Sequence, residues 1–324
     1  MRVARIAAKE KKTLEILDKF TALNFEIARW SGFSDLRDEK KPGAFKRLYF
    51  CPPEEMGFYF RIRNRITDLW LQRVGLKCLE NWLIPESLME STHNYFCEME
   101  EDYRRHVEKF MSKYSGYIKA WQVKQPKLAH IVDHPRFSEE NVMNKFRLKW
   151  YFFKIVPASG YLLRQDFIDE IDGLELKLYS EVAEIAETLW ETIYANRVKI
   201  VSRTAGPIKV IKAKLEGLIF LSPIISSTVR IIDAAILDLP FKLSNKTIPP
   251  ETIENIQKLL WILKDVDRCY AASQAADTGQ PVLSILDEVD LEPGPALLAK
   301  PDKSAKTIRA QRGSVSHAVQ LQKN

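Results

Sequence analysis

The sequence contains little cysteine, glycine or proline, and each shortage excludes a class of protein. Its 324 residues include four cysteines, which are Cys51, Cys78, Cys97 and Cys269, and no two of them form a CxxC pair. A zinc ribbon and a thioredoxin motif are therefore excluded, and the wide spacing is typical of reduced intracellular thiols. With 12 glycines and 16 prolines, the composition disfavours loop-rich β architectures and favours long helices.

Long hydrophobic runs are missing as well. The longest, from Gly217 to Val229, is interrupted by Pro223 and is too short to span a bilayer. The N-terminus is charged throughout, so no secretory signal peptide is expected. Hydrophobic residues make up 46% and charged residues 28% of the chain, as in globular proteins. We therefore expect a cytoplasmic protein.

The net charge of +6 is concentrated at the two ends of the chain. Residues 1–12 carry five basic side chains and one acid, and residues 300–324 carry six basic side chains and one acid. These balances of +4 and +5 leave −3 for the body between them. Basic ends favour weak, salt-sensitive contact with an acidic partner or with nucleic acid.

Motifs for catalysis are absent from the sequence, which has no GxSxG, HExxH, GxGxxG or P-loop pattern. The segment "HIVDHP" places His130, Asp133 and His134 close together, but Pro135 disfavours the helix on which two histidines could share a metal ion. A surface loop is the preferred interpretation. We expect no catalytic, cofactor-binding or metal-binding residues, and a protein that is not an enzyme.

Apolar residues at alternating steps of three and four predict two long helices. The first follows Pro85, continues for about five heptads and predicts a helix of about 35 residues. The second covers roughly residues 174–200. We expect these helices to pack as an antiparallel, coiled-coil-like hairpin around a compact inserted segment. The recurring positions, mostly apolar, are Leu88, Thr92, Phe96, Met99, Tyr103, Val107, Phe110, Tyr114, Tyr117 and Trp121, and then Leu174, Leu178, Val182, Ile185, Leu189, Ile193, Asn196 and Ile200.

Shorter helices are expected on both sides of this hairpin. One apolar stripe predicts a helix from about residue 14 to residue 30, ending near Gly32, and another predicts a helix over residues 53–75. Further helices follow Pro207, Pro223 and Pro250. Three aromatic-rich segments, at about residues 46–51, 76–84 and 147–155, are predicted to form a small sheet, with helix as an open alternative for the last.

The expected fold is therefore mainly α, with a long antiparallel helical hairpin, a helical bundle and a small β-sheet. Four regions follow from the pattern. They are an N-terminal helical region (1–85), the long hairpin with its inserted segment (86–205), the C-terminal helices (206–276) and a largely disordered basic tail (277–324).

Two segments are candidate contact sites. The first is basic and could bind a partner or nucleic acid, although an ordinary solvated helix face with some ion pairs is the preferred interpretation. The second resembles an amphipathic segment that orders on a partner, with packing on its own body as an equal alternative. Their residues are Arg197, Lys199, Arg203, Lys209, Lys212 and Lys214, and then Ile285, Leu286, Val289 and Leu291. Of the first group, Lys199, Lys209, Lys212 and Lys214 are expected mostly in solvent.

Four stretches together resemble a bacterial and phage family described only as a domain of unknown function. They are "ARWSGFSDL", "RVGLKCLENWLIPE", "FKIVPAS" and "LWETIYANRVKIVSRTAGPIKVIKAKLEGLIFLSP". The resemblance covers roughly residues 25–270 and rests on Trp30-Ser31-Gly32, on Gly75 with Leu79 and Ile84-Pro85, and on the helix from Leu189 through Leu221.

The resemblance implies partners, because genes of that family typically lie on phages, plasmids and integrative elements. They often neighbour genes for a MoxR- or cobalt-chelatase-like AAA+ ATPase and a von Willebrand factor A protein. This implies a non-catalytic adaptor or subunit of an ATP-driven remodelling assembly. The alternative is a nucleic-acid-binding accessory protein of a mobile element, and an enzyme assembled from distant residues is the third and weakest hypothesis.

Overall fold

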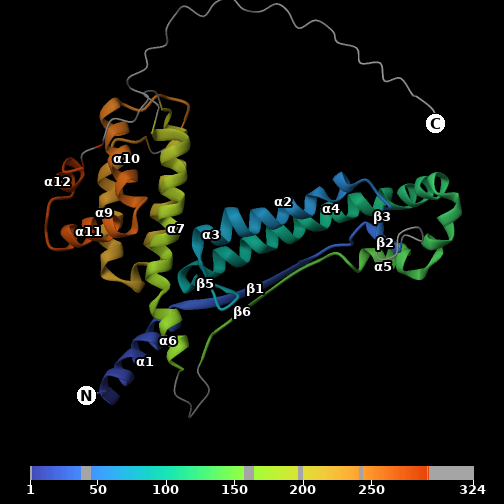
Figure 1. Cartoon of the computed structure of the whole chain (residues 1–324), viewed down its shortest axis with the longest axis horizontal. Coiled ribbons are helices and arrows are strands. Elements are labelled where there is room, and N and C mark those ends of the chain that lie inside the picture. Colours follow the sequence, from blue (N-terminus) through green and yellow to red (C-terminus); the bar gives the residue numbers. More distant parts are fainter. Residues whose placement is uncertain are drawn as a thin grey trace, which may run out of the picture.

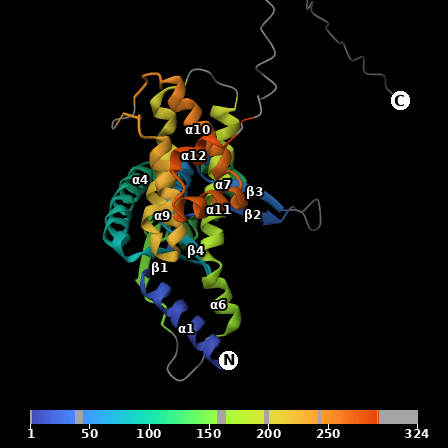
Figure 2. The ribbon, with the colours of Figure 1, turned by 90° about the vertical axis from the view of Figure 1, so that its left-hand side faces the viewer.

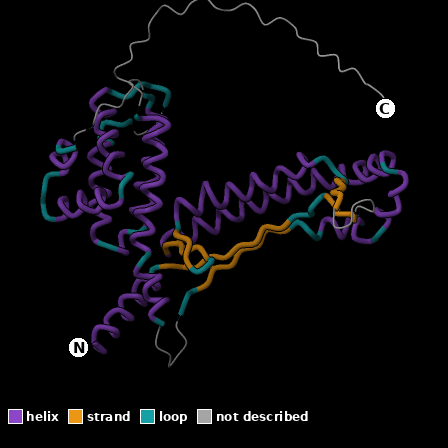
Figure 3. Tube along the Cα trace, in the orientation of Figure 1, coloured by secondary structure: helices purple, strands orange, loops and turns teal. Residues whose placement is uncertain are grey.

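The computed structural model describes residues 2–37, 45–156, 164–195, 200–240, 244–289 and 291. The chain is mainly helical (70%), as predicted, and contains one small antiparallel sheet of four strands. Figure 1 shows the elements in space and Figure 3 separates helices from strands. Within the described ranges, no helix combines the length and the apolar character that crossing a bilayer requires.

The chain first forms the elements of an elongated region and then those of a helical bundle. The strands are β1 (Phe20–Ala28), β2 (Phe33–Arg37), β3 (Phe45–Tyr49), β4 (Leu76–Cys78), β5 (Asn81–Pro85) and β6 (Arg147–Phe153). The helices are α1 (Arg2–Asp18), α2 (Gly57–Ile66), α3 (Gln72–Val74), α4 (Met89–Lys124), α5 (Glu139–Met143), α6 (Gln165–Asp172), α7 (Leu174–Leu189), α8 (Gly206–Gly217), α9 (Pro223–Ala235), α10 (Pro250–Leu263), α11 (Val266–Asp277) and α12 (Val282–Asp287).

Two bodies make up the molecule. The bundle (residues 164–195, 200–240 and 244–289) lies at one end, and the arm (residues 20–37 and 45–156) extends away from it as a long layer of α2 and α4 over β1 and β6 (Figure 1). Each body has its own buried apolar cluster, and the base of the arm adds Phe20, Leu76 and Leu83 to the cluster of the bundle. Seen from the bundle end, the β2–β3 hairpin projects to one side, and α1 and α6 lie together at the bottom (Figure 2).

The long helix after Pro85 is confirmed, since α4 runs for 36 residues and its predicted seam residues Phe96, Met99 and Tyr103 are buried. The prediction that α4 packs against the helix after residue 174 was wrong. The antiparallel neighbour of α4 is α2, whereas α7 packs on α8, α10 and α11 in the other cluster. The physical reason is the aromatic seam, which contacts aromatic side chains of α2 and β1, for example Tyr103 with Phe58 at a ring-centroid distance of 5.6 Å.

The helix predicted from residue 14 to residue 30 ends at Asp18, and β1 follows it. In the sheet, whose order is β4-β5-β1-β6, β1 lies between β5 and β6. Leu23, Phe25 and Ile27 alternate with the exposed Asn24 and Glu26, which is the pattern of a strand with one packed face. The prediction of a helix over these residues was wrong, because they form hydrogen-bonded pairs with strands on both sides although their apolar spacing also fits a helix.

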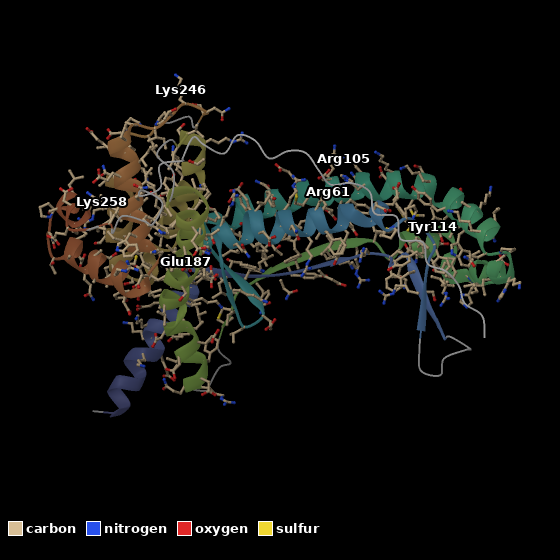
Figure 4. All side chains as sticks on the ribbon, turned by 45° about the horizontal axis from the view of Figure 1, so that its top comes forward. Arg61, Arg105, Tyr114, Glu187, Lys246 and Lys258 are labelled. Atoms are coloured by element: carbon tan, nitrogen blue, oxygen red, sulfur yellow. The ribbon has the colours of Figure 1, made fainter. Side chains whose placement is uncertain are left out.

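The predicted sheet segments separate into two sheets. The segments at residues 76–84 and 147–155 contribute β4, β5 and β6 to the same sheet, so the helical alternative for the last segment is wrong. The segment at residues 46–51 belongs elsewhere, because β3 pairs antiparallel with β2, Phe33 opposite Tyr49, in a separate two-stranded sheet. That hairpin lies at the far part of the arm, near the labelled Tyr114, whose hydroxyl donates to the carbonyl of Phe137 at 2.6 Å (Figure 4).

Two π-helical turns shift the buried faces of their helices. In a regular α-helix, Leu69 would continue the buried face of Phe58, Ile62 and Ile66, but the π-helix Thr67–Leu71 leaves Leu69 48% exposed and buries Leu71 fully. A second π-helix, Trp190–Tyr194, follows α7 and buries Tyr194 instead of Ile193. Each wider turn adds a residue to the helical repeat, so the residues beyond it rotate about the axis.

Candidate interaction surfaces

The basic segment predicted as a contact face is largely engaged with its own protein. Arg197 and Lys199 lie outside the described residues, and Arg203 is exposed in a turn before α8. Lys209 donates to the carbonyl of Pro240 at 3.4 Å. Lys212 forms ion pairs with Glu216 at 3.4 Å and with Asp233 at 2.6 Å, and the hydrogen bond that it donates to Asp233 raises its pKa.

Lys214 was expected in solvent, and this expectation was wrong. The residue is 2% exposed, and its ammonium group contacts the carboxylate of Glu181 on α7 and donates to the backbone carbonyl of Gln72 at 2.6 Å. Burial lowers its pKa, and Glu181 opposes that shift. Its position three residues after Ile211 and four before Leu218 places it on the buried stripe of α8, and the sequence carried that signal. Lys214 therefore fastens the arm to the bundle.

The predicted docking segment packs on its own body. Ile285 and Leu286, on α12, are 6% and 1% exposed and belong to the apolar cluster of the bundle. Val289 and Leu291 are half-buried. The ordered bundle therefore continues past the expected boundary at residue 277, because α12 covers α9, α10 and α11. The alternative of packing on its own body is confirmed for Ile285 and Leu286.

The histidine pair is on the surface, as expected, but His130 lies in a 3₁₀-helix, Pro126–Asp133, rather than in a loop, and His134 follows that helix directly. His130 and His134 are exposed, and His134 Nδ1 accepts a hydrogen bond from the backbone N–H of Arg136 at 3.2 Å. Among the described residues, no group of three or more His, Cys, Asp and Glu side chains could hold a metal ion.

A groove that no sequence pattern predicted runs along the arm between α4 and the edge of the sheet. Its volume is about 500 Å3. One wall consists of α4 side chains and the other of the start of β6, and Met143 and Phe146 also line the groove. The lining residues are Cys97, Glu100, Glu101, Tyr103, Arg104, Val107, Met143, Phe146, Arg147, Leu148 and Lys149.

The strand beside this groove is an edge strand. In the described part of the chain β6 pairs only with β1, from Ala28 opposite Arg147 to Ala22 opposite Phe153. Leu148 points toward the helices and is 5% exposed, while Arg147, Lys149 and Tyr151 point away and are exposed. Arg147 forms an ion pair with Glu26 at 2.5 Å, which lowers the pKa of Glu26.

Cys97 and His93 stand together next to the groove, one helical turn apart, with Sγ 3.6 Å from Nε2. The indole N–H of Trp150 donates to His93 Nδ1 at 3.3 Å. Because an indole can only donate, neutral His93 carries its proton on Nε2, toward the thiol. A general base for Cys97 would need a free lone pair on that nitrogen, so this arrangement does not activate the thiol as a nucleophile.

The motif residues on which the family resemblance rests have structural roles. Trp30 is buried at the far part of the arm, where its ring lies 5.5 Å from that of Tyr114, and Gly32 has a φ of +74°. At Gly75, a Cβ atom would lie 2.6 Å from Ile84 Cδ1 and 2.9 Å from the carbonyl oxygen of Leu83. Only glycine allows α3 to turn this closely into the β4–β5 hairpin.

Comparison with protein families gives one match. A family model described as a protein of unknown function, DUF3150, matches residues 17–265. The chain belongs to the DUF3150 family. No curated protein and no solved structure matches it significantly. The DUF3150 region contains the whole arm, the groove and the junction at Lys214, and it ends just before α11.

Proposed function

We propose that this DUF3150 protein is a non-catalytic adaptor or subunit of an ATP-driven remodelling assembly encoded on a phage or other mobile element. Its partners would be a MoxR-like AAA+ ATPase and a von Willebrand factor A protein, which the family resemblance implies. The structure supports this proposal because the arm and the bundle present two separate surfaces within one molecule. An adaptor needs two such surfaces, held at a defined distance.

The observation that carries the proposal is the opposite charge of the two bodies. The described residues of the arm contain 21 Lys and Arg against 16 Asp and Glu, a balance of +5, and those of the bundle contain 11 against 19, a balance of −8. Figure 4 shows charged side chains of both signs along both bodies, with Arg61 and Arg105 on the arm helices and with Glu187, Lys246 and Lys258 on the bundle. Opposite fields on two separated bodies favour two different partners and steer each to its own body.

The test is co-purification with the ATPase encoded beside the gene, in the presence of ATP, followed by size-exclusion chromatography with light scattering. A complex of fixed stoichiometry supports the proposal. A variant lacking residues 292–324 then tests whether the basic C-terminal segment contributes to the complex. Because this variant keeps α12, any loss of binding would not come from an incomplete bundle. Separate elution of the two proteins in every nucleotide state contradicts the proposal.

Nucleic-acid binding is the second candidate, and the outward face of β6 favours it. Arg147, Lys149, Tyr151 and Phe153 follow one another on that face, and Tyr151 and Phe153 are 59% and 41% exposed. Cations beside exposed aromatic rings suit the backbone and bases of a single strand. A fluorescent oligonucleotide should bind with an affinity that falls steeply with salt. Tyr151→Ala should weaken this binding, and Leu237→Ala on the bundle should not.

A further inference from the structure

We infer that the groove between α4 and β6 binds an extended segment of a partner protein, in which acidic and apolar residues alternate, as an added strand on β6. The inference rests on the proposed function only in that the chain acts by holding partners. It identifies the chemistry of one partner, which neither the family match nor the resemblance provides.

The open edge of β6 supplies the main-chain contacts. Residues 147–153 pair with β1 on one side, and no described strand pairs with them on the other. An edge strand presents a row of N–H and C=O groups that a second chain can pair with. Recognition by strand addition takes its affinity from these main-chain hydrogen bonds and its specificity from pockets for alternate side chains.

The groove supplies those pockets. The wall on α4 runs from Cys97 to Val107, which corresponds to about 15 Å at the helical rise of about 1.5 Å per residue. A strand of four or five residues covers this length at about 3.4 Å per residue. Val107, Phe146 and Leu148 form the apolar floor, and Met143 adds an apolar side chain that is 40% exposed. An added strand would place every second side chain on this floor.

Charge determines which side chains fit the outward-facing positions of the added strand. The side chains of an added strand that do not face the floor would lie beside Lys149 and Tyr151 and beside Arg147, which also pairs with Glu26, on the outward face of β6. Opposite charges favour each other across neighbouring strands, and like charges disfavour each other. Arg104 adds a further cation on the helix wall, although Glu100 and Glu101 also line it. Acidic residues therefore fit the outward positions, and the basic arm as a whole favours them.

Cys97 allows a direct test of this groove in the full chain. It lines the groove and is exposed, whereas Cys51, Cys78 and Cys269 are buried. The probe is a blocked seven-residue peptide in which glutamate and valine alternate. We expect saturable binding by fluorescence anisotropy, and slower alkylation of Cys97 at the same peptide concentrations.

Three comparison peptides separate the contributions. A peptide with lysine in place of glutamate tests charge, one with the same composition in a non-alternating order tests the alternation, and one with N-methylated alternate amides tests the main-chain pairing. Each should bind about tenfold more weakly or not at all. Met143→Asp should weaken the original peptide about tenfold, because it places a charge on the apolar floor. Val123→Asp, at an 81% exposed residue of α4 outside the groove, is the matched control.

Other outcomes would overturn the inference. It fails if none of the peptides binds, or if binding leaves the alkylation rate of Cys97 unchanged. It also fails if a single-stranded oligonucleotide protects Cys97 and the peptides do not, or if light scattering shows a dimer that Lys149→Glu dissociates, since the edge would then belong to a second copy. The experiment uses no ATPase, so its failure and that of the adaptor proposal can be told apart.

Discussion

Lys214 has an environment that is unusual for its residue type, since lysine is almost never fully buried without a partner. The ammonium group loses hydration in the junction between arm and bundle, and Glu181 and the carbonyl of Gln72 replace part of it. The two partners come from α7 and α3, so one side chain from α8 connects three helices of two bodies.

Removing this charge should destabilise the protein. Lys214→Met keeps most of the side-chain volume but leaves Glu181 and the Gln72 carbonyl without their partner. The expected loss is about 2–4 kcal/mol in the free energy of unfolding, measured by urea denaturation. Lys212→Met is the control, because its ion pairs are solvent-accessible and should contribute less than about 1 kcal/mol. Equal losses in the two variants would contradict this role for Lys214.

Stability should fall at alkaline pH because burial raises the pKa of thiols and phenols. It raises the pKa of Cys51 and of Cys78 from 9.0 to about 11, and that of Cys269 to about 12. The unfolded chain therefore releases these protons first as the pH rises. The contribution of the three buried, protonated thiols to the free energy of unfolding is fully present below about pH 9. It is lost between that value and about pH 12.

Thermal unfolding followed by circular dichroism from pH 7 to pH 11 checks this window. The melting temperature should stay level at first and then drop above about pH 9. A melting temperature that rises above about pH 9 would contradict the raised pKa values of the buried thiols.

At the scale of elements, the periodic apolar pattern predicted helices well and their neighbours poorly. The spacing of three and four residues predicted α2, α4, α7 and α8, because each helix buries one stripe. The same spacing misassigned β1, where Leu23, Phe25 and Ile27 also fit a strand. It could not identify the partner of α4, since an aromatic seam fits α2 and α7 equally well in sequence. The groove escaped prediction because a strand edge and the side of a helix leave no apolar stripe.

The last helix, α12, should be required for the stability of the bundle. A chain that ends after residue 276 loses Ile285 and Leu286, each of which contributes about 1.5–3 kcal/mol when fully buried. A chain that ends after residue 291 keeps both. Urea denaturation of the two chains should therefore give a lower midpoint for the shorter one, by an amount equivalent to several kcal/mol at most. Equal midpoints would show that α12 does not belong to the cooperative unit.

At the scale of the whole molecule, the junction should fix the angle between arm and bundle. Three of the contacts that cross it are the hydrogen bond from the ammonium group of Lys214 to the carbonyl of Gln72 at 2.6 Å, the hydrogen bond from the ammonium group of Lys177 to the carbonyl of Lys77, and the edge-to-face packing of Phe20 on Phe220 with ring centroids 4.9 Å apart. Polar and apolar contacts on several helices resist both sliding and rotation, so the two charged bodies keep a set separation.

Spin labels on the two bodies would measure this rigidity. Cys97 supplies the site on the arm, and Leu237→Cys, at a residue that is 78% exposed, supplies the one on the bundle. The distance distribution measured by pulsed electron–electron double resonance should have a single narrow peak. Lys214→Met should broaden this peak because the junction loses the hydrogen bond to Gln72. Lys212→Met, whose ion pairs lie within the bundle, should leave it narrow. A broad distribution in the unmodified junction would mean that the arm swings, and an adaptor of this kind would then hold its partners without a fixed distance.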